Sequence, residues 1–262
     1  MGERVDGPDD AWAGREVPSS ARLLTKRAWF ETKTIVARYP IVALPIARRR
    51  HGTPVDDATE IVIEAFPRSG MTFAVVAFEM VQPTPVSVAC HVHAPAQLIE
   101  ATRRGLPALV LIREPEPTIL SFVIRHPHVT MRQALRAYAR FYEPLVRYRD
   151  DVVVGRFADV TTDFGAVTRR VNVRFGTRFA EFAHTPENVE RVFAAISSDY
   201  QERTRSVAEL ERTVARPSEE RERIKASLRE GYRAPALARS RDRAGAVYMS
   251  MTSAAAPSGD RR

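Results

Sequence analysis

The sequence predicts an α/β fold in which helices flank a central parallel sheet. Four short runs of apolar and β-branched residues alternate with segments of helical periodicity, and this alternation is typical of β-α-β crossovers. The runs occupy residues 61–66, 86–93, 106–113 and 151–157. In parallel sheets, ligands bind outside the carboxyl ends of the strands, so functional residues are expected where these runs end.

Length and composition are those of a globular protein with a sizeable core. The chain has 262 residues, of which 44% are hydrophobic, and a formal net charge of +8. The basic residues comprise 37 arginines and only three lysines, and this bias favours an acidic ligand only weakly. Cys90 is the single cysteine, which excludes an internal disulfide and predicts a cytoplasmic location. The longest apolar run, residues 41–47, contains Pro45 and is far shorter than the roughly 20 residues of a membrane-spanning helix.

Four units are expected along the chain. Residues 1–19, rich in Asp, Gly, Pro and Ser, predict a disordered tail without the apolar segment of a secretion signal. Residues 20–56 predict a basic, amphipathic helical extension that Pro40 ends or kinks. The α/β domain is expected at residues 57–250, followed by a second disordered tail at residues 251–262. The extension could rest on a membrane surface, cover a pocket or, as is more common, pack against the domain.

The central stretch, residues 61–73, predicts a buried strand, a tight turn and the start of a helix. Pro67 ends the strand because it has no N–H group, and Gly70 lets the backbone turn sharply and approach a ligand. The apolar residues of segment 71–80 recur at helical spacing. The free N–H groups of that helix predict an anion site, most commonly for phosphate. The turn is not a Walker A loop, because the lysine of that motif is absent.

Basic residues stand at three strand ends. The first strand leads to Arg68, the second to His93 and the third to Arg113. Ser121 follows eight residues after Arg113, two turns into the next helical segment, so these two side chains could grasp one anion. Singly, each residue has an ordinary alternative: a solvated charge, a satisfied strand histidine, a salt bridge to a neighbouring glutamate, or a polar residue on a helix. Together they predict a ligand with two separated phosphate-like groups.

The later helical segments predict packing rather than recognition. Segment 131–149 carries leucine, aromatic and valine side chains on one broad face and arginines on the other. Segment 188–205 repeats the pattern with valine, phenylalanine and isoleucine. Both are typical of helices with one face in the core and one in solvent, so no nucleic-acid partner is expected.

The turn and the residues after it resemble the sulfotransferases that use 3′-phosphoadenosine-5′-phosphosulfate (PAPS), especially the cytosolic type. The first loop of that family reads Y-P-K-S-G-T-T-W, and this chain has Phe66-Pro67-Arg68-Ser69-Gly70-Met71-Thr72-Phe73. Its second signature runs from a strand-end arginine to a serine eight residues on, as Arg113 and Ser121 do. Its T-H-L-P segment, which contains the catalytic histidine, corresponds to Val92-His93-Ala94-Pro95. The resemblance covers roughly residues 60–180, including the stretch Phe157-Ala158-Asp159-Val160.

The resemblance implies a three-layer, P-loop-like fold and a sulfotransferase that needs PAPS as co-substrate and no metal. The first loop would bind the 5′-phosphosulfate, and Arg113 with Ser121 would bind the 3′-phosphate. A hydroxyl or amine of a small-molecule, carbohydrate or lipid acceptor would attack sulfur in line while His93 takes its proton. Arg68 would stabilise the charge that develops on the leaving oxygen.

Four departures from the family pattern affect these roles. Arg68 replaces a lysine, so it can stabilise the leaving group but does not readily donate a proton to it. Met71 removes one hydroxyl contact, and Phe73 replaces a tryptophan that stacks on adenine. The C-terminal R-K-G loop of the family is absent, and Arg216 could serve the 3′-phosphate or be a solvated charge before a helix cap. The expected nucleotide-binding residues are Arg68, Ser69, Gly70, Met71, Thr72, Phe73, Arg113, Ser121 and Arg216.

Other residues compete with His93 for the role of base. His91, two residues earlier on the same face of the expected strand, is the natural rival, and Glu79 on the first helix is a carboxylate alternative. With His126 and His128, the two histidines also make two H-x-H pairs that could hold zinc, but nothing in the sequence brings the pairs together.

Two alternatives to a sulfotransferase remain. One is a nucleotide-dependent phosphotransferase of the wider P-loop class, which magnesium-dependent ATP hydrolysis would favour. The other is a non-catalytic nucleotide-binding protein of the same fold, which tight nucleotide binding without transfer would favour. The sequence carries no pattern that names the acceptor or the oligomeric state.

Overall fold

A parallel sheet of four strands, in the order β2-β1-β3-β4, forms the centre of the computed structural model. The structure describes residues 20–49, 52–203 and 219–253. The strands are β1 (Ile61–Ala65), β2 (Val88–Cys90), β3 (Ala108–Ile112) and β4 (Val153–Arg156). Each lies inside one of the four predicted apolar runs, so the predicted α/β fold with a parallel sheet is confirmed. Every residue of β1 and β3 is buried, as expected for inner strands that are covered on both faces.

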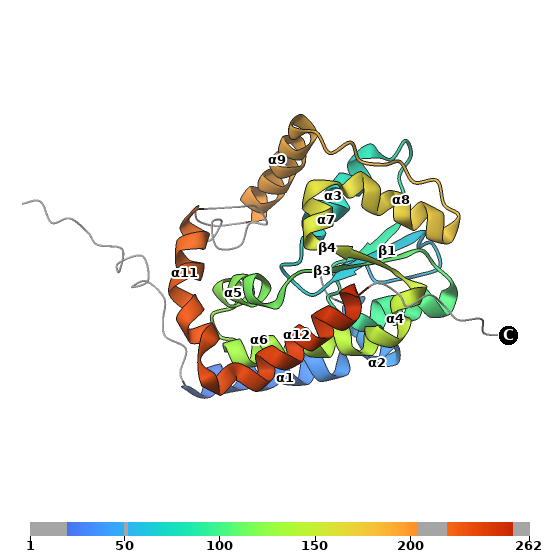
Figure 1. Cartoon of the computed structure of the whole chain (residues 1–262). Helices are drawn as coiled ribbons and strands as arrows, with labels where there is room; N and C mark the ends of the chain where they lie inside the picture. The colour runs from blue at the N-terminus through green and yellow to red at the C-terminus, as the bar shows by residue number, and fades with distance from the viewer. Residues whose placement is uncertain (1–19, 50–51, 204–218, 254–262) are drawn as a thin grey trace, which may run out of the picture.

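Helices cover both faces of the sheet (Figure 1). On one face the helices share a hydrophobic core with Ile61 and Ile63 of β1, and on the other with Val62, because successive strand residues point to opposite faces. The first face is covered by α3 (Met71–Val81), α8 (Phe164–Phe175) and α9 (Pro186–Arg203). The second face is covered by α4 (Pro95–Arg104), α6 (Met131–Tyr142) and α12 (Ala238–Thr252).

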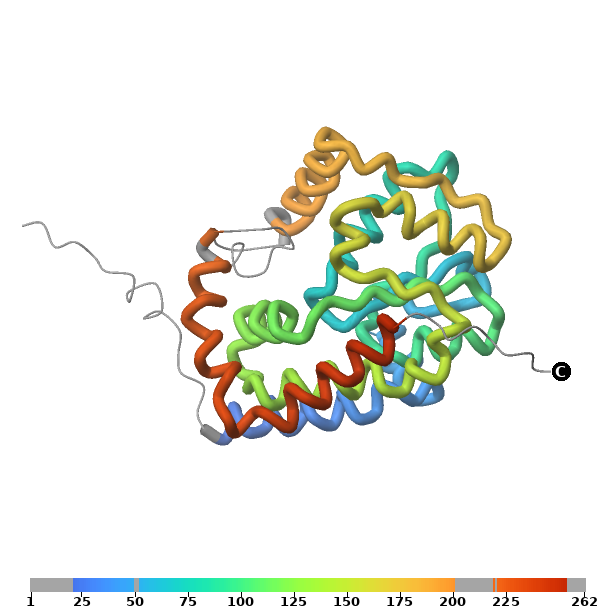
Figure 2. Tube along the Cα trace, viewed as in Figure 1, coloured from blue at the N-terminus to red at the C-terminus, as the bar shows by residue number. Residues whose placement is uncertain are grey.

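The N-terminal helices form an outer layer on the second face. The first, α1 (Ser20–Val36), packs along α6, and the second, α2 (Pro40–Ala47), packs on α4. Pro40 separates them as predicted, because it occupies the first turn of α2, where its missing N–H group costs nothing. The remaining helices are α5 (Pro115–Arg125), α7 (Phe157–Thr162), α11 (Glu219–Arg233) and a short 3₁₀ helix, η3 (Pro235–Leu237). The helix α11 packs against α5 (Figure 2).

The helix predicted at residues 131–149 is shorter than expected. It begins at a capping box, in which the Thr130 hydroxyl accepts from the Gln133 amide and the Gln133 side chain accepts from the Thr130 amide, both at 3.2 Å. The α-helix ends at Tyr142, and a 3₁₀ helix, η2 (Glu143–Asp151), continues the chain. Pro144 explains the change, because it has no N–H group with which to continue the α-helical pattern.

The second strand also differs from the prediction. It ends at Cys90, so His91 and His93 do not lie on the strand, and their predicted place on one face of it is wrong. His91 and His93 instead belong to a loop and have positive φ angles of 61° and 54°. Within the described part of the chain, no helix is long and apolar enough to cross a membrane. The tails predicted at residues 1–19 and 251–262 lie outside the described residues, except that α12 continues to Thr252.

Candidate functional site

The turn after β1 contains two residues with left-handed backbone geometry. Arg68 has a φ angle of 74° and Gly70 one of 89°. A Cβ atom on Gly70 would lie 3.1 Å from the ring of Phe157, so the turn fits closely against the start of α7 and requires glycine here. Among the described residues, no side chain caps α3. The first N–H groups of this helix are therefore left to bind water or a ligand.

Two tyrosines of α6, one helical turn apart, fix the ends of β1 and β3. The Tyr142 hydroxyl donates to the carbonyl of Leu111 at 2.8 Å and accepts from the amide of Phe66 at 3.3 Å. The Tyr138 hydroxyl donates to the carbonyl of Arg113 at 2.7 Å. These hydrogen bonds hold the strand ends, and with them the basic residues that follow, on rigid buried anchors.

Five cationic side chains converge beside the turn, from Arg68, Arg113, Arg125, Arg221 and Lys225. Burial lowers the pKa of Arg68 from 12.5 to about 9, with smaller contributions from the charges of Arg221 and Arg125. Burial also lowers the pKa of Lys225; its ion pair with Glu222 acts in the opposite direction, and the charges of Arg113 and Arg221 lower the pKa further. The side chains of Arg221 and Lys225 are buried, although both come from the surface helix α11. Burying like charges together costs free energy, so this cluster is typical of a site that binds an anion.

Arg113 and Arg125 each present a hydrogen-bond donor without an acceptor in the described part of the chain. These donors are the buried Nε atom of Arg113 and the buried Nη1 atom of Arg125. The guanidinium carbon of Arg113 lies over the Phe157 ring, 3.8 Å from its centroid, which positions the group without satisfying its N–H donors. Because an unsatisfied buried donor is costly, both arginines are poised for anionic oxygens.

The structure brings Arg68, Arg113 and Ser121 together. The Arg68 Nε atom donates to the Ser121 hydroxyl at 2.9 Å, and the Arg113 Nη1 atom donates to the Arg68 carbonyl at 3.4 Å. Arg68 is thus the link between the two residues that the sequence places eight positions apart. The first loop and the second pair form one continuous basic site.

One ring nitrogen of His93 is hydrogen-bonded to the backbone, which fixes the orientation of the ring. Its Nδ1 atom lies 3.0 Å from the carbonyl of Ala65. Because a carbonyl only accepts hydrogen bonds, Nδ1 carries the proton and the Nε2 lone pair is left to accept another. Burial lowers the pKa of His93 from 6.5 to about 4, although its side chain is 31% exposed. At neutral pH the ring is therefore uncharged, which is the form that acts as a base.

Glu64, in the middle of the sheet, holds the loop that carries His93. This buried carboxyl accepts hydrogen bonds from the amides of Val92 at 3.0 Å and His93 at 3.1 Å, and from the amide of Ala65 at 2.9 Å. Burial raises its pKa from 4.5 to about 8, and the three amide contacts act in the opposite direction. Its Oε1 atom lies 3.7 Å from Nδ1 of His93. Glu64 stabilises the positive φ angles of the loop and orients the His93 ring.

The rival bases occupy less favourable positions. Glu79 is exposed on α3, on a stretch of helix two turns beyond the anion site. The His91 ring lies 5.9 Å from that of His93, in the same loop. The rings of His126 and His128 are also 5.9 Å apart. In residues 20–49, 52–203 and 219–253, no group of three or more His, Cys, Asp or Glu side chains is arranged to hold a metal ion.

Phe73 lies in the core rather than at an open surface. Its side chain is 5% exposed and packs on the rings of Phe182, His184 and Phe193 at centroid distances of 5.5–6.1 Å. An adenine ring that stacked on Phe73 would have to replace one of these neighbours. Met71 is buried as well.

The other predicted residues of the turn are placed as follows. Ser69 is fully buried, with its hydroxyl 3.5 Å from that of Tyr142, and Thr72 is half-buried at the start of α3. Arg216 lies outside the described residues.

Four site residues are missing from the sequence-based prediction: Glu64, Arg125, Arg221 and Lys225. Helical spacing contains a signal for three of them. Arg125 follows Ser121 by four residues, and Lys225 follows Arg221 by four, so each pair shares one face of its helix. Glu64 has no such signal, because a single carboxylate within an apolar strand is usually exposed.

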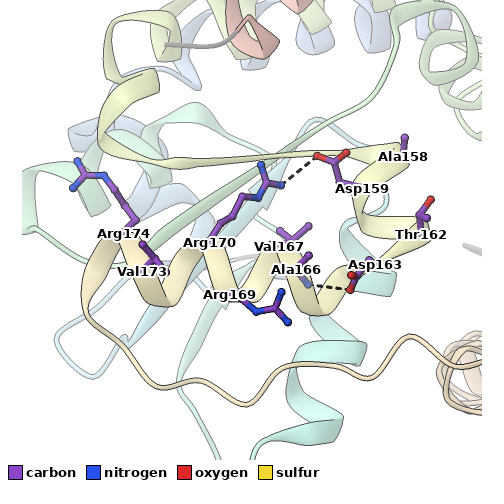
Figure 3. Close-up of a pocket in the computed structure, with 10 residues that line it drawn as sticks. All are labelled: Ala158, Asp159, Thr162, Asp163, Ala166, Val167, Arg169, Arg170, Val173 and Arg174. Carbon is purple, nitrogen blue, oxygen red and sulfur yellow. Dashed lines mark hydrogen bonds and ion pairs between the residues drawn. The ribbon is translucent and has the colours of Figure 1, made fainter. Parts of the chain in front are cut away.

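A second arginine-rich region lies between α7 and α8, where a groove of about 720 Å³ opens (Figure 3). Its arginines already have partners. Arg170 Nη2 donates to Asp159 at 3.2 Å, Arg169 forms an ion pair with Glu181 at 2.6 Å, and Arg174 donates to a backbone carbonyl at 3.0 Å. With its charges matched, this groove lacks the features of an anion site.

Comparisons with solved structures give distant structural likenesses. The chain is similar to the crystal structure of mouse sulfotransferase SULT7A1 complexed with PAP, at 11% sequence identity and a TM-score of 0.40. The match covers 76% of this chain and 92% of that chain. No protein-family model matches the sequence, and no curated protein matches it either.

Proposed function

We propose that this protein is a sulfotransferase that moves a sulfuryl group from PAPS to a hydroxyl or amine of a small-molecule, carbohydrate or lipid acceptor. One observation carries the proposal. Arg68, Arg113 and Ser121 meet at the carboxyl edge of the sheet, and the loop that holds His93, oriented and uncharged, lies at the same edge. Anion binding and a base at one sheet edge are what sulfuryl transfer requires.

The cation cluster suits a ligand with two phosphate groups. Arg68 and the uncapped N-terminus of α3 would bind the 5′-phosphosulfate. Arg113 and Ser121 would bind the 3′-phosphate, with the unsatisfied Arg113 Nε as one of the donors. Arg221 and Lys225 reach this cluster from α11, so they would supply the C-terminal cover that the missing R-K-G loop supplies in the sulfotransferases this sequence resembles.

In the transfer step, an oxygen or nitrogen of the acceptor forms a bond to sulfur as the bond from sulfur to the 5′-phosphate oxygen breaks. The acceptor proton passes to Nε2 of His93, which then carries a positive charge. Glu64, 3.7 Å from Nδ1, lies where its ionised form would stabilise that charge. Arg68 stabilises the negative charge that develops on the leaving oxygen, and as a strong base it does so as a fixed cation rather than as an acid.

The first test is calorimetric binding of adenosine 3′,5′-bisphosphate, compared with ATP and AMP. We expect the bisphosphate to bind most tightly. Replacing Arg113 by alanine should cost about 1.5–3 kcal/mol for one charge-assisted contact, a roughly 10- to 150-fold loss of affinity. The matched control is Arg170→Ala in the groove, which should bind as wild type. Equal affinity for the three nucleotides would contradict the proposal, and a preference for ATP would favour a phosphotransferase.

The second test follows transfer of labelled sulfuryl from PAPS to a panel of acceptors. His93→Gln should lower turnover by about 10²- to 10⁴-fold, the usual contribution of a positioned base. The affinity for the bisphosphate should stay unchanged, because His93 does not belong to the cation cluster. Undiminished turnover in His93→Gln would remove this residue from the mechanism. Tight nucleotide binding without transfer to any acceptor would instead favour a binding protein of this fold.

A further inference from the structure

The helix α2 presents an apolar outer face. Its inner residues Ala43 and Leu44 are buried against the domain, whereas Ile41 is 88% exposed, Val42 43% and Ile46 42%. Single exposed apolar side chains are normal on a protein surface, but three on one face of an eight-residue helix form a contiguous patch. We call these three residues the α2 face.

The apolar surface continues from the α2 face toward α1. Tyr39, just before α2, is 47% exposed, and Ile35, at the end of α1, is 44% exposed. In Figure 1 these two helices, in blue, form the outermost layer on their side of the sheet. The patch is therefore accessible along one side of the molecule.

Positive charge surrounds the α2 face. The segment of residues 32–55 contains five arginines and lysines and not a single aspartate or glutamate. Of these, Arg38, Arg48 and Arg49 are exposed at the two ends of α2, and Arg38 lies over the Tyr39 ring, 4.8 Å from its centroid. An apolar face bordered by arginines and an interfacial aromatic ring is complementary to an anionic lipid surface.

We propose that the α2 face docks on membranes that contain anionic phospholipids. Its isoleucines and valine enter the boundary between headgroups and acyl chains, and the arginines at both ends of α2 contact lipid phosphates. A second copy of this chain is a less suitable occupant, because two copies of the same patch would bring arginines together without any carboxylate from residues 32–55.

The docking surface lies next to the segment that carries His93. The Ala96 amide donates to the Ala37 carbonyl at 3.1 Å, and Ala37 and Ala43 pack on Ala94 and Ala96. His93 directly precedes Ala94, so docking places the predicted base close to the membrane. If the proposed function holds, on which this step rests, the acceptor class is an amphiphile whose hydroxyl or amine lies at the lipid surface.

The test is flotation of the full-length protein with vesicles of phosphatidylcholine alone and of phosphatidylcholine with phosphatidylglycerol. We expect wild type to float with the anionic vesicles, and less so at high salt. Ile41→Gln, a change at an exposed position, should weaken this binding at least tenfold. Val173→Gln is the matched control, because Val173 is 82% exposed on α8, on the opposite side of the sheet. It should float as wild type does.

Three outcomes would overturn the docking proposal. These are no flotation of wild type, equal flotation of wild type and Ile41→Gln, or a dimer that Ile41→Gln dissociates while vesicles do not bind. Bisphosphate calorimetry on Ile41→Gln keeps the two proposals separate, because the substitution should leave nucleotide affinity unchanged. If the protein binds vesicles but not the bisphosphate, the proposed function is refuted and the docking proposal stands. If it binds the bisphosphate but not vesicles, only the docking proposal is refuted.

Discussion

The two arginine-rich regions of this protein differ in what their charges face. In the groove between α7 and α8, Arg169 and Arg170 meet carboxylates of Glu181 and Asp159, and hydrogen bonding to Glu181 raises the pKa of Arg169. At the carboxyl edge of the sheet, burial lowers the pKa of Arg68 to about 9, and the charges of Arg221, Arg125 and Arg113 act in the same direction. Phe157 belongs to both regions, since it begins α7 and supports Arg113.

The difference separates arginines that are paired with carboxylates from the buried arginines that the proposed function assigns to anion binding. An arginine paired with a carboxylate needs nothing further, and at the surface such a pair contributes little. Burying several cations close together, with Glu222 as the carboxylate that pairs with Lys225, lowers the stability of the empty protein, and a bound anion would reverse that cost. Both regions are rich in arginine, so the sequence alone does not distinguish them. The residues that each arginine contacts do.

The largest expected effect follows from replacing Arg68 by glutamine. Because the pKa of Arg68 is lowered on folding, its positive charge costs stability at neutral pH, and the variant without ligand should unfold at a higher temperature than wild type. The same change removes at least one charge-assisted contact and should weaken bisphosphate binding by roughly 10- to 150-fold. Thermal unfolding with and without adenosine 3′,5′-bisphosphate measures both effects.

The order of stability should reverse between the two conditions. Without ligand Arg68→Gln is the more stable protein, and at saturating bisphosphate wild type is. A variant that is less stable than wild type in both conditions would mean that Arg68 is a structural residue, held by its hydrogen bond to Ser121 rather than awaiting an anion.

Much of the fold was predictable because its signals are local. Strand runs, the turn at Gly70 and the helix after it depend on residues that are neighbours in sequence. The basic residues at the ends of β1 and β3 were predictable for the same reason, since parallel topology brings strand ends to one edge. The left-handed conformation of Arg68 and the loop after β2 were not, because Glu64 and Tyr142 fix them from distant positions.

The full composition of the site depended on long-range contacts. Arg125 joins the cluster because α5 is close to the turn, and Arg221 and Lys225 join it because α11 packs on α5. Helical spacing pairs residues on one face but does not say which face is buried. For this reason the sequence analysis selected Arg216, which lies outside the described residues, and did not identify Arg221 and Lys225 of α11.

The buried carboxyl of Glu64, beside His93, has different partners from those of Asp159 in the groove. Asp159 in the groove accepts from arginines, whereas Glu64 accepts from backbone amides near His93. The pKa of Glu64 is raised from 4.5 to about 8, so the stability it contributes is complete below pH 4.5 and is lost as the pH rises through about 8. His93 has the opposite sign: its contribution is complete above pH 6.5 and is lost as the pH falls through about 4.

Between pH 6.5 and about 8 the contribution of His93 is constant, so Glu64 should determine how the free energy of unfolding of wild type differs from that of Glu64→Gln. In this window wild type should lose up to about 1.4 kcal/mol of unfolding free energy per pH unit, a slope that Glu64→Gln should lack. Chemical denaturation across the window measures both slopes. Parallel slopes would show that Glu64 is already ionised at pH 6.5, held so by its three amide donors.

The smallest effect is expected in the groove, where Arg170→Gln removes a half-exposed ion pair with Asp159. Asp159 keeps its second arginine partner, Arg156, so no carboxylate is left buried alone. The free energy of unfolding should change by about 0–1 kcal/mol, and bisphosphate affinity should not change. Chemical denaturation and calorimetry on the same preparation measure the two quantities. A loss of bisphosphate affinity comparable to that of Arg113→Ala would contradict the distinction between the two regions, because an arginine with a carboxylate partner would then contribute to anion binding.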